Sequence, residues 1–246
     1  MNRKRRLISD TFISRKRKAV TERFGLSDVD GPTDVKTTVE YLMTLFPRKL
    51  FNDALPQIVL KHQLYSLIND KTMVDKGVGD LLMFQLGFDS EAFGLVFATD
   101  YKAKVLAGQD GRDTQETVQK FCDKVLSSST DLSFSKDQMR DFLFTDAEIT
   151  QLVKSGVLTV RDAGSWWLSI PNSGKYTKYF IQGRKAVINM VKKSKYNEVL
   201  KADLEDRKTP SQVKFHMKYH IHDIVGAELV ESIPTTSGTL LRYVDA

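Results

Sequence analysis

Apolar residues recur along the chain in short periodic runs, separated by polar segments and by Gly or Pro. Positions three and four apart predict a helix over Asp34–Leu45, which Pro47 ends. The apolar runs Phe84–Phe88 and Phe93–Phe97 flank Asp89-Ser90-Glu91 and predict a hairpin. The other helices predicted in this first block are Ala54–Leu60, Gln63–Ile68, Thr72–Leu82 and Tyr101–Leu106.

A second block repeats this order of helices followed by strands. Thr145 and Glu148 form a capping-box pattern at the start of its last helix, and Gly156 is placed to end that helix. Cys122 falls on the apolar face of the first helix and is expected in the core. The helices predicted here are Asp113–Leu126, Ser135–Phe142 and Asp146–Lys154, and the extended segments are Val157–Val160, Trp166–Ile170 and Tyr176–Ile181.

A third block opens with a predicted long helix, Arg184–Asp206, which Thr209-Pro210 closes. Its apolar side carries Val187, Met190 and Val191. Lys185 and Lys192 lie on the opposite face, and Lys193 and Lys195 lie on its flanks. Lys214–Val230 is expected to be mostly helical, and Thr239–Val244 to form a closing strand.

Helices followed by a hairpin, three times in blocks of roughly 65–75 residues, predict an α+β, mostly helical chain of three tandem winged-helix domains. The expected boundaries are 33–108, 109–182 and 183–246, and a disordered basic tail is expected over 1–32. Winged helices bind nucleic acid in some proteins and other proteins elsewhere, so the fold alone leaves the function open.

Positive charge is segregated along this chain of net charge +6. Residues 175–220 hold twelve Lys/Arg against four Asp/Glu, and the first thirty residues hold nine against four. The remaining residues hold sixteen basic and twenty-three acidic side chains. Clustered cations that displace condensed counterions supply most sequence-independent affinity for nucleic acid. The alternative is a solvated basic face that has no partner.

The basic residues of the N-terminal tail form two short clusters. This arrangement predicts a bipartite nuclear import signal and hence a nuclear protein, and the same residues could add loose phosphate contacts. The tail has no apolar segment of a secretory signal, and no apolar run is long enough to span a membrane. The two clusters are Arg3, Lys4, Arg5, Arg6 and Arg15, Lys16, Arg17, Lys18.

No catalytic, metal or cofactor site is predicted. The chain has neither the glycine-rich loop nor the catalytic loop of a protein kinase, and Asp162-Ala163-Gly164 is expected to be a turn between strands. His216, His220 and His222 have helical spacing, but no cysteine or acidic partner in a known zinc pattern accompanies them. Trp166 and Trp167 are neighbours in a strand, so one ring should face the core and the other outward.

Seven segments, in order along the chain, match a known pattern: 45–48, 53–60, 85–89, 156–168, 178–180, 219–223 and 235–242. They closely resemble the family known as serine/threonine-protein kinase 19, and the resemblance runs from about Val39 to Arg242. It implies three winged helices without kinase architecture, in nuclear proteins that bind double-stranded DNA and RNA. It also implies a bridging role in transcription-coupled nucleotide excision repair, with RNA polymerase II, the Cockayne-syndrome A subunit, the UV-stimulated scaffold protein and TFIIH as partners.

The same resemblance implies DNA contacts from Lys192, Arg207 and Lys208, and a weaker contact from Lys71. The segment after Lys76 is several residues shorter than the family pattern, which indicates a shortened third helix in the first domain. The charge count adds further residues to the expected binding surface. These are Arg184, Lys185, Lys193 and Lys195.

Phosphate contacts by lysine predict binding with little sequence preference. The alternative functions are a protein-only adaptor whose basic face docks an acidic partner, and a protein kinase, for which the chain offers no phosphate cradle. The chain is expected to be a monomer or a homodimer.

Overall fold

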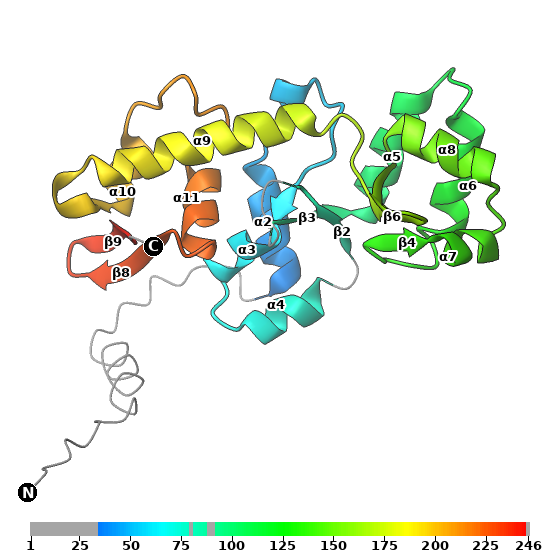
Figure 1. Cartoon of the computed structure of the whole chain (residues 1–246). Coiled ribbons are helices and arrows are strands. Elements are labelled where there is room, and N and C mark those ends of the chain that lie inside the picture. The colour runs from blue at the N-terminus through cyan, green and yellow to red at the C-terminus, as the bar shows by residue number, and fades with distance from the viewer. Residues whose placement is uncertain (1–33, 79–80, 88–91, 245–246) are drawn as a thin grey trace, which may run out of the picture. The chain divides into compact units, whose positions relative to one another are not determined.

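The computed structural model describes residues 34–78, 81–87 and 92–244. The predicted tail, with both halves of the import signal, lies outside these residues. In the described part, one element order occurs three times: helix, strand, two helices and two further strands (Figure 1). Each repeat closes a small antiparallel sheet of three strands, in which the last strand lies in the middle. This is the winged-helix topology predicted from the sequence.

The first unit begins with the predicted N-terminal helix. One prediction is wrong here: residues 54–60 end in a strand rather than forming a helix. The helix expected over Thr72–Leu82 ends at Gly77, in agreement with the shortened third helix that the family resemblance indicated. A Cβ atom at Gly77 would lie 2.6 Å from Cγ2 of Val35, so glycine allows α4 to pack against α2. The elements are α2 (Val35–Thr44), η1 (Arg48–Phe51), β1 (Val59–Leu60), α3 (Lys61–Tyr65), α4 (Lys71–Gly77), β2 (Leu81–Gln85) and β3 (Phe93–Phe97).

The second unit follows α5 (Ala98–Gln109) and agrees closely with the predicted pattern. The Thr145 hydroxyl accepts a hydrogen bond from the Glu148 N–H at 3.2 Å, and the Glu148 carboxylate accepts one from the Thr145 N–H at 2.7 Å. Gly156 ends α8 with a φ of 80°, as the sequence indicated. The elements are α6 (Gln115–Lys124), β4 (Ser133–Ser135), α7 (Lys136–Asp141), α8 (Asp146–Ser155), β5 (Leu158–Asp162) and β6 (Ser165–Leu168).

The third unit departs most from the sequence-based expectation. Tyr176–Ile181, expected to be extended, lies in α9, and the long helix expected over Arg184–Asp206 ends at Lys192. The predicted boundary between residues 182 and 183 therefore falls inside α9. The elements are α9 (Gly174–Lys192), η2 (Lys195–Asn197), β7 (Glu198–Leu200), α10 (Lys201–Asp206), α11 (Met217–Gly226), β8 (Val230–Thr235) and β9 (Gly238–Tyr243).

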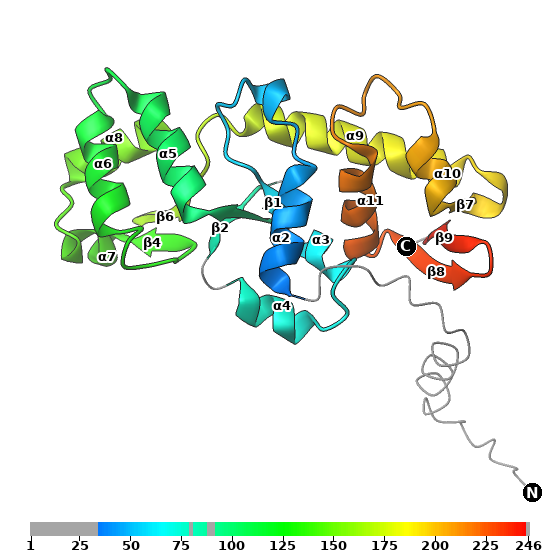
Figure 2. The same cartoon turned by 180° about the vertical axis from the view of Figure 1, so that it is seen from behind.

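Apolar packing joins the units. One buried cluster extends from Phe46 in the first unit through the second unit to Tyr219 in α11. Cys122 belongs to this cluster, as predicted, and burial raises the pKa of its thiol to about 11. The first and third units also have cores of their own. Helix α11 packs against both α9 and α3, which both views of the ribbon show (Figures 1 and 2).

Candidate nucleic-acid interface

Six of the predicted nucleic-acid-binding residues lie together in the third unit. They come from the second half of α9 and the C-cap residue that follows it, from η2, and from the loop that follows α10. All six are exposed, and none forms an ion pair with a carboxylate of the described residues. We call this set the basic surface: Lys185, Lys192, Lys193, Lys195, Arg207 and Lys208.

Packing on the opposite side of α9 holds the basic surface in place. Val187 and Val191 are fully buried, so the helix keeps one face toward the core. The Lys192 ammonium lies 3.9 Å from the centroid of the Tyr243 ring, a cation–π contact that joins the end of α9 to β9. Arg207 donates a hydrogen bond to the Ser194 hydroxyl at 3.3 Å, which ties the loop after α10 to the end of α9.

A groove of about 570 Å³ runs between α9 and the loop after α10. Lys185 and Lys193 stand beside it, and Ala186, Met190 and Pro210 line it with apolar atoms. This arrangement offers ammonium groups to phosphate oxygens and apolar surface to a sugar or base.

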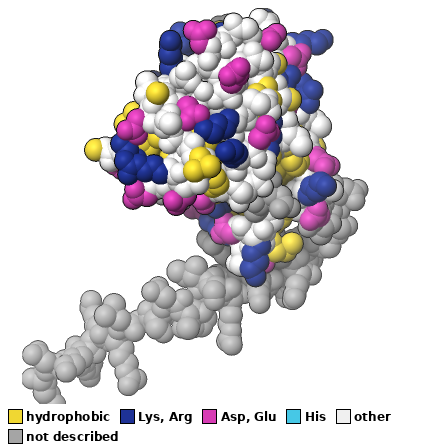
Figure 3. All heavy atoms as spheres, turned by 90° about the vertical axis from the view of Figure 1, so that its right-hand side faces the viewer, with side chains coloured by type: hydrophobic (Ala, Val, Ile, Leu, Met, Phe, Trp, Pro, Cys, Tyr) yellow, Lys and Arg dark blue, Asp and Glu magenta, His cyan; other side chains and the backbone are white. Residues whose placement is uncertain are grey.

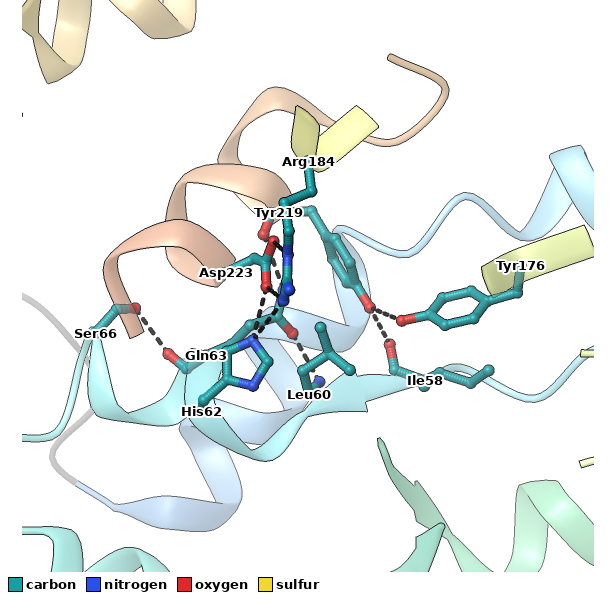
Figure 4. Close-up of polar contacts among 9 residues, drawn as sticks. All are labelled: Ile58, Leu60, His62, Gln63, Ser66, Tyr176, Arg184, Tyr219 and Asp223. Carbon is teal, nitrogen blue, oxygen red and sulfur yellow. Dashed lines mark hydrogen bonds and ion pairs between the residues drawn. The ribbon is translucent and has the colours of Figure 1, made fainter. Parts of the chain in front are cut away.

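Arg184, the seventh residue predicted on this part of the chain, lies in a different environment. Its Nε donates to the Asp223 carboxylate at 2.8 Å, and Nη2 pairs with the other oxygen of that carboxylate. The His62 Nε2 lies 2.7 Å from the same oxygen (Figure 4). The Arg184 side chain is 15% exposed and that of Asp223 is fully buried. The guanidinium therefore binds a carboxylate inside the protein and is not placed to bind phosphate.

The acid of this cluster stays ionised despite its position. Burial alone would raise the pKa of Asp223, but hydrogen bonds from His62 and Arg184, together with the Arg184 charge, hold it below its ordinary value. Because His62 lies in α3, Arg184 in α9 and Asp223 in α11, the cluster joins the first unit to the third.

Lys71, the predicted contact in the first unit, is exposed but paired. Its ammonium lies 3.0 Å from the Glu228 carboxylate and 5.3 Å from the centroid of the Tyr65 ring. Exposed ion pairs of this kind contribute little to stability. The carboxylate nevertheless offsets the charge that Lys71 would bring to a phosphate.

Helix α11 takes the place in the third unit that a groove-reading helix takes in a DNA-binding winged helix. Here it is packed against α3: the Gln63 amide donates to the Tyr219 carbonyl at 2.8 Å, and Ser66 hydrogen-bonds Nδ1 of His222 at 2.8 Å. A Cβ atom at Gly226 would lie 1.8 Å from the His62 carbonyl oxygen. The helix is therefore largely buried, and the basic surface belongs to the first helix of the unit and to its loops.

The three histidines with helical spacing, His216, His220 and His222, lie in different environments. His220 and His222 are buried, and His216 is exposed and accepts a hydrogen bond from the Lys218 N–H at 3.3 Å. Burial lowers the pKa of His220 to about 4 and that of His222 to about 3. Within the described residues, no group of His, Cys, Asp and Glu side chains could hold a metal ion.

The second unit presents a different kind of surface. On the face that it turns to the viewer in Figure 3, Lys and Arg side chains alternate with Asp and Glu. The predicted turn between β5 and β6 is formed by Ala163-Gly164, and Asp162 is the last residue of β5. Trp166 packs against the core, and the Arg161 guanidinium lies 4.3 Å from the centroid of the Trp167 ring. This face therefore has no run of like charge comparable to the basic surface.

Sequence reasoning missed three residues that shape the interface. Tyr243 supports Lys192, Asp223 binds Arg184, and Tyr196 stands in η2 between Lys195 and Asn197. A lone carboxylate followed by Ile224 and Val225 in a helical segment was an available signal for Asp223. A tyrosine inside a lysine-rich segment was an available signal for Tyr196.

Three copies of the winged-helix topology, with the basic surface on the third, define the chain as a tandem winged-helix protein. None of the described helices is long and apolar enough to cross a membrane. A protein-family model described as "Inactive serine-threonine protein kinase 19" matches residues 45–243. The chain belongs to this family, as the sequence resemblance implied.

Vertebrate relatives match nearly the whole chain and are named "Winged helix repair factor 1". The protein from Mus musculus is 47% identical over the full length of both chains. The protein from Homo sapiens is 51% identical over 86% of each chain, and that from Xenopus laevis is 43% identical over 98% of each. The word "inactive" in the family description agrees with the lack of kinase motifs in the sequence. The relatives' name describes a repair factor with winged helices, the fold found here.

Proposed function

We propose that this protein is a non-enzymatic factor of DNA repair that binds double-stranded DNA and RNA through the basic surface. The observation that carries the proposal is the set of six exposed cations, none of which pairs with a carboxylate in the part of the chain that the structure describes. Cations already paired within a protein must break that pairing to bind phosphate, and unpaired ones need not. The relatives' name, winged helix repair factor, supports the repair context.

Binding through the basic surface reads the phosphate backbone. Lysine ammonium groups contact phosphate without distinguishing bases, and the helix that would enter a major groove is packed against α3. We therefore expect weak sequence preference and a strong dependence on salt. Duplex RNA has a phosphate backbone of the same charge, so we expect the basic surface to bind it as well.

Within repair, we propose a bridging role in transcription-coupled nucleotide excision repair. The basic surface would hold nucleic acid, which leaves the mixed-charge face of the second unit for protein contacts. The partners expected from the family resemblance are RNA polymerase II, the Cockayne-syndrome A subunit, the UV-stimulated scaffold protein and TFIIH. Nuclear localisation, through the two N-terminal clusters, belongs to the same proposal.

Fluorescence anisotropy with a labelled duplex of about 20 base pairs tests the binding proposal directly. Lys192→Glu, Arg207→Glu and Lys208→Glu together should abolish measurable binding while the circular dichroism spectrum stays unchanged. A matched control is Arg112→Glu, Lys124→Glu and Lys154→Glu. These three cations are also exposed and outside any ion pair found among the described residues, but they lie in the second unit.

The two variants carry the same change of net charge. Loss of binding in the first alone would therefore assign phosphate binding to the basic surface. If both variants lost the same amount of affinity, net charge alone would account for the loss, and the assignment to the basic surface would be wrong. A parent protein that assembles with repair proteins but has no affinity for duplex would instead assign the basic surface to an acidic protein partner.

A further inference from the structure

Tyr196 stands among the cations of the basic surface with its ring in solvent. At 78% exposure it is the most exposed of the large apolar and aromatic side chains in the described part of the chain. The Lys195 ammonium lies 5.0 Å from the ring centroid. Lys192 and Lys193 precede Tyr196 in the chain, and Arg207 is held close by through Ser194.

The backbone presents this ring at a conformational cost. Tyr196 has φ 59° and ψ 20°, the left-handed region that bulky L-residues rarely adopt. The turn is held on both sides: the Asn197 N–H donates to the Ser194 carbonyl at 3.0 Å, and β7 pairs with β9 from Glu198 onward. Asparagine or glycine would occupy the position with less strain. Burial does not explain the tyrosine either, and the exposed ring is open to a contact outside the protein.

The chemistry around the ring indicates what that contact is. Aromatic side chains interleaved with cations are the means by which proteins bind unpaired nucleotides, since a base stacks on the ring while ammonium groups hold the flanking phosphates. Within an intact duplex, neighbouring bases cover both faces of each base. A ring on the protein surface therefore meets a free base face only at an end, a gap or an unpaired stretch.

We infer that Tyr196 stacks on an unpaired base, so that the basic surface prefers a duplex next to single-stranded nucleotides over a continuous duplex. The inference rests on the proposed function, because the lysines and Arg207 must first hold the phosphates. It adds a preference for nucleic-acid structure to a surface that is otherwise indifferent to base sequence.

The test compares two labelled probes of about 20 base pairs, a continuous duplex and the same duplex with a central run of mismatched thymines, on the full-length protein. The parent should bind the mismatched probe between about 5-fold and about 150-fold more tightly, the range expected for one stacked base. Tyr196→Asn should lose this preference and Tyr196→Phe should keep it. Both probes have the same two ends, so the ratio of the two affinities isolates the contribution of the unpaired stretch.

Leu143→Asn is the matched control. Leu143 is 70% exposed and also left-handed, with φ 63°, but it lies between α7 and α8 of the second unit. Both asparagine variants should melt at a higher temperature than the parent because they relieve backbone strain. Only Tyr196→Asn should change the discrimination between the probes.

A parent that binds both probes equally would overturn the inference and leave the proposed function standing. So would a preference that survives Tyr196→Asn or disappears in Leu143→Asn. A parent that binds neither probe would overturn the proposed function itself.

Discussion

At the residue scale, Gly226 marks the closest approach of α11 to α3. A Cβ atom there would lie 1.8 Å from a backbone oxygen of His62, which cannot move as the end of a side chain can. We expect Gly226→Ala to lower the free energy of unfolding by about 3 kcal/mol, the upper end of the usual cost of overpacking. Gly108→Ala is the control, since nothing lies within 4 Å of its new Cβ atom. It should raise stability by up to about 1 kcal/mol.

Urea unfolding of both variants measures the difference. Comparable stability of Gly226→Ala and the parent would show that α11 and α3 are not packed as described. Neither glycine stands out in the sequence, because the atom that excludes a side chain at Gly226 comes from a distant part of the chain. Glycine was predictable at Gly156 because the helix-ending signal there is local.

His220 and His222 predict how stability depends on pH. Burial lowers the pKa of both side chains, to about 4 and about 3, so each stays neutral in the fold and gains a proton on unfolding below about pH 6.5. Their contribution to stability is complete above that pH. It falls as the pH drops toward 4, by up to about 1.4 kcal/mol per pH unit for each histidine.

Urea unfolding at about pH 7, 6 and 5 measures this slope for the parent and for His220→Leu. The His220 imidazole stacks on Phe180, and neither of its nitrogens has a hydrogen-bond partner among the described residues. Asp223 and Arg184 are the charges that act on it. His220→Leu should roughly halve the slope, which leaves the part due to His222. An unchanged slope would contradict the neutral, buried state of His220.

At the scale of elements, three helices meet in the cluster of His62, Arg184 and Asp223. We expect Arg184→Met to destabilise the protein by about 3–5 kcal/mol, because it leaves the Asp223 carboxylate buried without a compensating charge. Arg184→Met combined with Asp223→Leu should recover much of this loss, since neither charge then remains. Chemical unfolding of the two single variants and the double variant gives the coupling between the residues.

The same variants test the role of Arg184 in binding. Under conditions where Arg184→Met stays folded, its affinity for duplex DNA should equal that of the parent. A loss as large as that from the substitutions at Lys192, Arg207 and Lys208 would return Arg184 to the phosphate-binding residues.

The first half of helix α9 could not be predicted from the sequence. Tyr176, Phe180, Gly183, Val187 and Val191 form one buried stripe along it, yet the aromatic and β-branched residues of its first half suggested an extended segment. Tertiary packing decided the outcome, because the Tyr176 ring stacks on Phe46 of the first unit, and the Tyr176 and Phe180 rings both meet the Phe215 ring edge to face. The left-handed backbone at Tyr196, which ends the helical region, has no signal in residue type. Elements with local caps, such as α8, were predicted almost to the residue.

At the scale of the whole molecule, composition predicted where positive charge gathers but not which cations are free. Arg184 and Lys185 are neighbours in sequence, yet one is bound to Asp223 and the other is exposed. The difference arises from helix geometry and from a partner in another element, which a charge count does not contain. The repeated order of elements was predictable because each winged-helix unit is specified by local periodicity.

The dependence of binding on salt should count the phosphates that the basic surface neutralises. For duplex DNA the slope of log K against log salt is about −0.9 per phosphate. Replacing Lys192, Arg207 and Lys208 by glutamine should therefore make the slope shallower by up to about 2.7. The same replacements at Arg112, Lys124 and Lys154 should leave it unchanged, because these cations lie in the second unit and outside the basic surface. Anisotropy titrations across a series of salt concentrations measure both slopes. If the first variant bound more weakly with an unaltered slope, its cations would be acting through the fold or on a neutral group, and the phosphate-binding assignment would be wrong.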